Sequence, residues 1–166
     1  MESMHLRDEL KITRPLAPGH ELALAILLTR EYVGRLFEKG LFEDAAITDQ
    51  QFNVLRILKG GPAEGYLIRD LRERMIYRFA DVPRLVNRLE AQGLVQRCEN
   101  PSDRRGSRIR ITEAGLALEA RVHDRHDELC QRISRDLPDA DRDLLLGALE
   151  RLRNNLREEV RACERE

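Results

Sequence analysis

Aromatic residues are scarce in this 166-residue sequence: they make up 4% of it, and tryptophan is absent. We therefore expect the hydrophobic core to be aliphatic. No apolar run approaches the roughly 18 residues that a membrane-spanning helix needs. Residues 1–14 are polar and charged, without the apolar segment of a secretion signal. These absences predict a cytoplasmic protein with no membrane partner.

Cysteine is also sparse, and the common enzyme motifs are missing. Cys98, Cys130 and Cys163 are widely spaced and follow no metal-binding pattern, which favours reduced thiols over a disulfide framework. The sequence has no nucleophile elbow, no HExxH motif and no glycine-rich phosphate loop. We therefore expect no enzyme activity and no cofactor.

Charge is unevenly distributed along the chain, although the net charge is only −1. Residues 67–111 carry 11 arginines against 6 acidic residues, whereas the segments around them are each weakly acidic. One basic block between acidic flanks is typical of a protein that presents one face to a polyanion. A solvated arginine-rich surface is the alternative.

Hydrophobic periodicity predicts a mainly helical protein with a small β-hairpin. A loosely packed arm, residues 1–19, precedes the first long helix. Thr48 and Gln51 form a capping box, Asp81 is a favourable N-cap, and Gly93 is placed to end the helix before it. The expected helices are 21–42, 48–59, 68–75, 81–92, 113–135 and 140–161, and the expected strands are 94–98 and 108–112.

Two short helices followed at once by a charged hairpin have the order of a winged helix-turn-helix. Helix 81–92 has one polar face, made by Arg84, Asn87 and Arg88. In the DNA major groove arginine pairs with guanine and asparagine with adenine, and either residue also binds phosphate. A merely solvated helix face is the alternative. The apolar stripe on the other side of this helix consists of Val82, Leu85, Val86 and Leu89.

The tip of the predicted hairpin reads Asp103-Arg104-Arg105-Gly106. A guanidinium on a narrow tip suits the minor groove of A·T-rich DNA, where the potential is most negative. Phosphates repel a carboxylate, so we interpret Asp103 as a residue that orients a neighbouring arginine. The helix pattern and the hairpin, in this order, both favour DNA binding.

At this point the sequence resembles the multiple-antibiotic-resistance-regulator (MarR) family of bacterial transcription factors. The resemblance rests on the segment 81–95, on the wing pattern Asp103-x-Arg105-x-x-x-Ile109-x-Ile111-Thr112 and on Glu113-Ala114-Gly115 after it. It implies that Arg105 enters the minor groove, that Asp103 orients it, and that Arg84 lies in or beside the major groove. Pro83 replaces a hydroxyl residue common in the family, so no base preference is carried over. The candidate DNA contacts are Arg78, Asp81, Arg84, Asn87, Arg88, Asp103, Arg104, Arg105 and Ser107.

The same resemblance implies a homodimer whose two terminal helical regions interleave. The chain is then one MarR-type domain, 1–166, with dimerisation helices at about 20–46 and 113–161 and a winged helix-turn-helix at about 47–112. A two-fold dimer places its reading helices about 34 Å apart and reads a near-palindrome. Intrachain packing explains part of the apolar stripe on the last helix, which consists of Leu145, Leu149, Leu152, Leu156 and Val160.

Members of the family often bind a small aromatic or anionic effector between the dimer helices and the DNA-reading part, and repression is their commoner action. The candidate effector residues are Arg30, Tyr32, Arg35 and Arg69, although ordinary ion pairs explain them equally well. His123 and His126 lie one helical turn apart and offer two metal ligands, or a solvated pair. The prediction is thus a ligand-responsive repressor. The alternatives are a metal-responsive regulator of the same fold and a helical protein-interaction adaptor.

Overall fold

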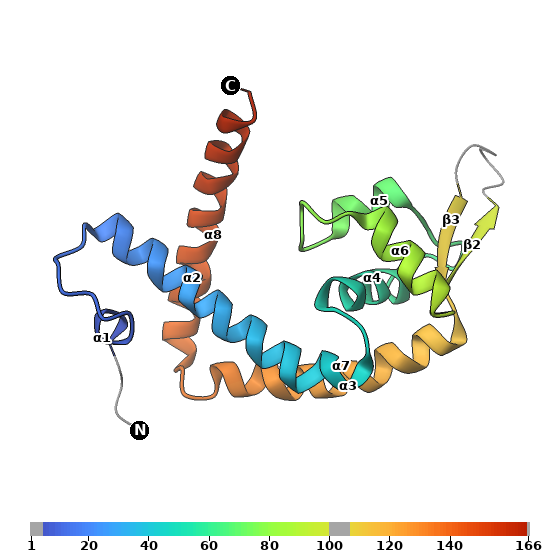
Figure 1. Cartoon of the computed structure of the whole chain (residues 1–166), viewed down its shortest axis with the longest axis horizontal. Coiled ribbons are helices and arrows are strands. Elements are labelled where there is room, and N and C mark those ends of the chain that lie inside the picture. The colour runs from blue at the N-terminus through green and yellow to red at the C-terminus, as the bar shows by residue number, and fades with distance from the viewer. Residues whose placement is uncertain (1–4, 100–106, 166) are drawn as a thin grey trace. The chain divides into compact units, whose positions relative to one another are not determined.

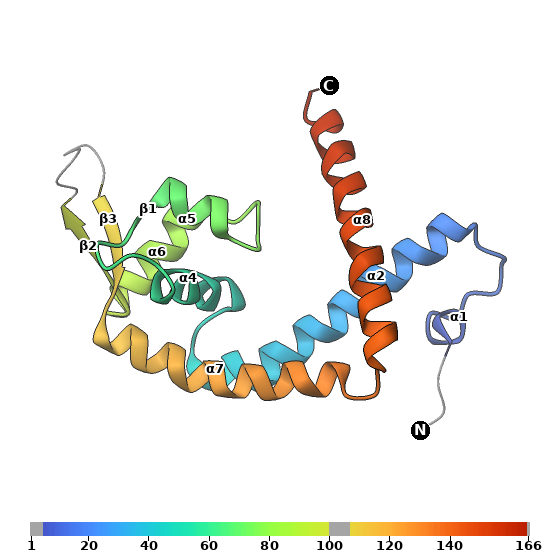
Figure 2. The same ribbon diagram turned by 180° about the vertical axis from the view of Figure 1, so that it is seen from behind.

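The computed structural model describes residues 5–99 and 107–165 (Figures 1 and 2). It is mainly helical with one three-stranded antiparallel sheet, which confirms the predicted fold class. The elements are α1 (Leu6–Glu9), α2 (Pro18–Phe37), the π-helical turn η1 (Glu38–Phe42), α3 (Glu43–Ala45), α4 (Asp49–Lys59), β1 (Tyr66–Leu67), α5 (Ile68–Arg74), α6 (Val82–Ala91), β2 (Val95–Glu99), β3 (Ser107–Ile111), α7 (Glu113–Ser134) and α8 (Asp139–Cys163).

The N-terminal region is more ordered than the sequence predicted. The expected arm, 1–19, contains the short helix α1, and α2 begins at Pro18 rather than at residue 21. Proline is tolerated in the first turn of a helix because the backbone N–H that it lacks would have no helical partner there. The helix expected to end at residue 42 passes through η1, whose Leu41 and Phe42 are buried.

Local sequence signals set the boundaries of α4 and α6 as predicted. The Thr48 hydroxyl accepts the Gln51 backbone N–H at 3.2 Å, and the Gln51 side-chain oxygen accepts the Thr48 N–H at 2.9 Å. This is the reciprocal capping box. The Asp81 carboxylate accepts the backbone N–H of Arg84 at 3.1 Å. After α6, Gly93 adopts φ +70°, a conformation that favours glycine.

The core of the first unit is mainly aliphatic, as the composition predicted, with Phe42 and Phe52 also buried, and most of it lies between α4, α5, α6 and β3. Fully burying one such side chain contributes about 1.5–3 kcal/mol. Figures 1 and 2 show α4, α5 and α6 gathered beside the sheet. This packing fixes which face of α6 is turned outward. The residues with 0% exposure are Val54, Leu55, Leu71, Met75, Val82, Val86, Leu89 and Ile109.

The sheet has the order β1-β3-β2, so a third strand joins the predicted hairpin. Strand β1 has two residues, and its Tyr66 pairs with Ile109 of β3. On the other side of β3, Val95 of β2 pairs with Ile111 and Glu99 with Ser107. A two-residue strand has no alternation of its own to detect, which explains why the sequence did not reveal β1.

A compact junction holds α6, β3 and α7 in register. The Thr112 hydroxyl donates to the Gly93 carbonyl at 2.7 Å and accepts the Gly115 N–H at 3.1 Å. A Cβ at Gly115 would come within 2.1 Å of the Leu94 carbonyl oxygen, so only glycine fits there. The start of α7 is therefore tied directly to the end of α6.

The chain divides into two compact units, Met1–His126 and Asp127–Glu166. The second contains the end of α7 and all of α8. Helix α8 has 25 residues and no buried ones. Within the described parts of the chain, no helix is long and apolar enough to cross a membrane.

Candidate nucleic-acid interface and adjoining cleft

Helix α6 presents one polar face outward because its apolar stripe is buried. Val82, Val86 and Leu89 have 0% exposure, whereas Arg84 and Arg88 are exposed. Asn87 is exposed beside them. The three polar side chains predicted to read DNA therefore share one accessible face. Asp81, a fourth candidate, caps the N-terminus of the helix through the Arg84 backbone.

Of the other candidates, the structure describes Arg78 and Ser107. Arg78, in the connection between α5 and α6, donates to the Glu73 carbonyl at 2.6 Å. Ser107 is exposed at the first position of β3. Asp103, Arg104 and Arg105 lie outside the described residues, and their roles stay predictions from the sequence.

One arginine of this interface was missed by the sequence reasoning. The Arg97 side chain, on β2, donates to the Asn87 side-chain oxygen at 2.6 Å and to Glu90 at 3.3 Å. The strand period could have found it, because residues 95 and 97 lie on the same face of a strand and Val95 is buried. Its partners on α6 could not be read from the sequence.

A cleft of about 680 Å³ adjoins α6 within the first unit. Its lining comes from α2, the start of α4, the α5–α6 connection and α6 itself, which contributes Leu85 and Arg88. The cleft combines arginines and aromatic rings, which suit an aromatic or anionic small molecule, with the carboxylates of Glu31, Glu38 and Asp49. The basic and aromatic lining residues are Arg30, Arg35, Arg56, Arg88, Phe37, Phe52, Tyr77 and His126.

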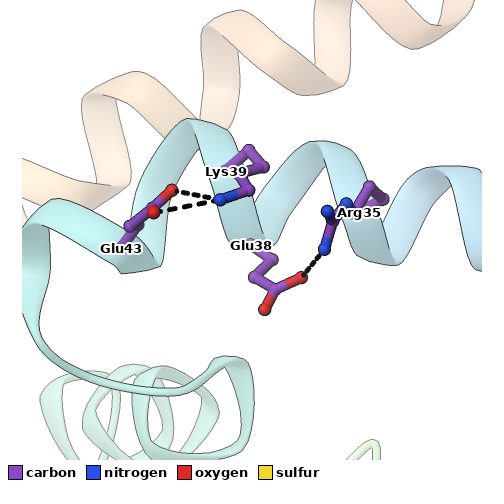
Figure 3. A network of polar contacts seen from close by, with 4 residues as sticks. All are labelled: Arg35, Glu38, Lys39 and Glu43. Atoms are coloured by element: carbon purple, nitrogen blue, oxygen red, sulfur yellow. Dashed lines mark hydrogen bonds and ion pairs between the residues drawn. The ribbon is translucent and has the colours of Figure 1, made fainter.

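The structure brings two of the four effector candidates to the cleft. Arg30 and Arg35 line it, and Arg35 also pairs with Glu38 at 3.1 Å (Figure 3). Tyr32 donates its hydroxyl to Glu9, and this contact raises the pKa of Tyr32. Arg69 lies 3.4 Å from the Asp70 carboxylate. Neither Tyr32 nor Arg69 is among the lining residues.

The two histidines do not share a cluster of metal ligands. The His126 ring packs against the rings of Phe37 and Phe52, with centroids 5.1 and 5.8 Å away. His123 Nδ1 lies 3.9 Å from the carboxylate of Glu119, a buried residue that also bonds Lys59. Among the described residues, no group of three or more potential metal ligands comes together.

Asp49 stands at the start of α4 and lines the cleft. Burial raises the pKa of the Asp49 carboxyl above its ordinary value, while the charges of His126 and Arg56 oppose that rise. The folded state therefore binds the Asp49 proton more tightly than the unfolded state does. The contribution of this group to stability is complete at low pH and is lost as the pH rises through the folded pKa.

We expect Asp49→Asn to become more stable relative to the wild type as the pH rises above the ordinary carboxyl pKa of about 4. The asparagine side chain at position 49 is uncharged at every pH, so the variant avoids the cost of burying a carboxylate there. Urea unfolding of both proteins from pH 4 to pH 8, at one fixed protein concentration, measures the difference. A wild type that gains stability over the variant with rising pH would contradict this assignment.

Known proteins resemble this chain in sequence and in fold. The model of the MarR family matches residues 47–106. The homoprotocatechuate degradative operon repressor of Escherichia coli is 29% identical over 112 residues, which are 68% of this chain and 74% of the repressor.

Two solved structures share the fold. The PcaV regulator of Streptomyces coelicolor, in complex with its natural ligand, aligns with a TM-score of 0.74 and 21% identity, over 86% of this chain and 98% of that one. A MarR variant of E. coli bound to operator DNA aligns with a TM-score of 0.69 and 24% identity, over 79% of this chain and 92% of that one. The MarR family model thus matches the segment that contains α4, α5, α6 and β2, and the chain as a whole shares its fold with MarR-type regulators.

Proposed function

We propose that the protein is a ligand-responsive transcriptional repressor that binds a specific double-stranded DNA operator. The outward polar face of α6, with Arg84, Asn87 and Arg88 exposed above a fully buried apolar stripe, carries this proposal. Strand β2 packs against α6, and Thr112 after β3 bonds to Gly93 at the end of that helix. The E. coli relative is a repressor, and the structurally similar MarR binds operator DNA. Its DNA target places the protein in the cytoplasm.

We also propose that the DNA-binding form is a homodimer that reads a near-palindrome. Helix α8 exposes large apolar side chains and buries none. Large exposed apolar surfaces usually mark protein interfaces, and a solvated helix gains little stability without packing. A second copy of the chain covers these side chains in the proposed dimer. The exposed apolar residues of α8 are Leu144, Leu145, Leu146, Leu156 and Val160.

The effector site of the proposed repressor is the cleft beside α6. Arg30, Arg56 and Arg88 supply positive charge, and Phe37 and Phe52 supply aromatic surface. PcaV, whose fold is similar, was solved with its natural ligand. Because Leu85 and Arg88 of α6 also line the cleft, a small aromatic carboxylate bound there contacts the reading helix itself. Such contact changes the DNA affinity if the ligand prefers one position of α6.

A gel-shift titration of the full chain with duplexes from the DNA upstream of its own coding sequence tests the proposal. We expect one duplex to shift specifically, with an affinity that falls by about three orders of magnitude between about 50 and 200 mM salt. Benzoate and 4-hydroxybenzoate serve as effector probes, and we expect a ring carboxylate to release the DNA. Failure to shift any duplex, including a randomised library at low salt, would refute the proposal.

A further inference from the structure

Arg97 reaches from the wing to the reading helix. It pairs across the sheet with Ile109, which has 0% exposure, and it shares a strand face with the buried Val95. Its stem therefore points to the core side of the sheet, where α6 packs. The Arg97 side chain is 31% exposed, and its long stem brings the guanidinium to Asn87 and Glu90 of α6.

Two side chains of α6 hold this guanidinium. Its terminal nitrogen donates to Asn87 Oδ1 at 2.6 Å, and its Nε donates to Glu90 Oε2 at 3.3 Å. Asn87 and Glu90 are three residues apart, so they lie next to each other on the helix surface. The Glu90 carboxylate also pairs with the positive charge of Arg97. The guanidinium is thus held by a carboxylate and by the residue expected to read a base.

This contact decides how Asn87 is oriented. A guanidinium has donors and no acceptor, so only the carbonyl oxygen of Asn87 can face Arg97. The side-chain NH₂ of Asn87 must then point away, toward the open side of α6. The usual adenine contact of asparagine needs both groups, with the oxygen accepting from N6 and the NH₂ donating to N7. Arg97 occupies one of the two groups that this contact requires.

We propose that Arg97 is a specificity-determining residue that makes Asn87 a donor, so that the pair selects a base with a keto oxygen in the major groove. Guanine offers two adjacent acceptors there, N7 and O6, and thymine offers O4. Adenine carries an amino donor at the same place, which opposes a donor from Asn87. The inference rests on the proposed DNA-binding function, and it replaces the adenine contact expected from the asparagine alone.

Selection of bound duplexes from a randomised DNA library by the full-length protein tests this inference. Asn87→Ala first identifies the base pair that Asn87 reads, as the position whose preference it abolishes. At that position we expect the wild type to prefer guanine or thymine over adenine by about tenfold. Arg97→Met keeps the apolar stem. It is expected to reduce this preference below about threefold, so that duplexes with adenine at this position are also bound.

Two further variants make the test specific. Arg110→Ala removes one positive charge from the neighbouring strand β3 and is expected to leave the preference unchanged. Glu90→Gln weakens the second anchor of Arg97 and is expected to shift the same position in the same direction, by less. Thermal unfolding of each variant checks that it folds. If Arg97→Met does not fold, Glu90→Gln still tests the inference.

Each outcome separates the inference from the function on which it rests. A wild type that enriches no sequence refutes the proposed function itself. A wild type that selects adenine at the Asn87 position overturns the role of Arg97. So does an Arg97→Met protein that loses affinity equally for all sequences, since that identifies a phosphate contact. An unchanged preference in both Arg97→Met and Glu90→Gln overturns it as well.

Discussion

Replacing both Arg84 and Arg88 with alanine is expected to lower the affinity for the operator by about 100-fold or more, while the protein stays folded. Each side chain offers donors for base edges or phosphates, and such contacts contribute about 1–3 kcal/mol each. Neither side chain is part of the core, because both residues are exposed while Val82 and Val86 beneath them are not. Alanine also has the highest helix propensity, and the Asp81 cap binds only the backbone of residue 84.

Fluorescence anisotropy with a labelled operator duplex, at several salt concentrations, measures this loss. Arg121→Ala is the matched control, because Arg121 is an exposed arginine of α7 outside the basic block. We expect that control to bind within about twofold of the wild type. Wild-type affinity in the double variant would mean that the polar face of α6 is solvated surface, which is the alternative that the sequence left open.

The single variants separate DNA reading from effector response. Arg84 is not among the residues that line the cleft, whereas Arg88 is. If the same α6 side chain serves both surfaces, Arg88→Ala changes the response to a ring carboxylate as well as the DNA affinity, and Arg84→Ala changes the affinity alone. This distinction follows from the position of α6 between the cleft and the outer surface.

Features set by nearby residues were predictable from the sequence. Thr48, Asp81 and Gly93 act within four residues of themselves, and each ends or begins a helix as expected. The buried and exposed faces of α6 also follow from one periodicity. At the N-terminus the predicted boundary was wrong: α2 begins at Pro18, inside the expected arm, because proline suits a first helical turn.

Features set by contacts between distant segments were not predictable. Strand β1 exists because Tyr66 meets Ile109, 43 residues away in the chain. The contact of Arg97 with Asn87 joins a strand to a helix, and spacing alone does not show that the two side chains meet. For the same reason, only two of the four predicted effector residues line the cleft. Arg30 and Arg35 both belong to α2, but Arg56, Asp49 and His126 reach the cleft from other elements.

The apolar stripe of α8 carries the second large effect. Leu156→Glu is expected to raise the dissociation constant of the dimer by about 100-fold or more, because burying an uncompensated carboxylate costs several kcal/mol. Leu156 is 51% exposed in the single chain, so its substitution does little harm to the fold of one subunit. In a two-fold symmetric interface the change occurs twice, which enlarges the effect.

The matched control is Asn154→Glu, which adds the same charge to α8 on the side of the helix opposite Leu156. Light scattering is expected to give twice the chain mass for the wild type and for this control, and a monomer for Leu156→Glu at micromolar concentration. A monomer presents one reading helix and one wing, so it loses the half-site pairing on which operator affinity depends.

A Leu156→Glu protein that stays dimeric would show that the α8 stripe is not part of the interface. A monomeric wild type would refute the proposed dimer. If the variant is monomeric but still binds the operator at wild-type affinity, one α6 with its wing reads the site alone, and the near-palindrome is no longer required.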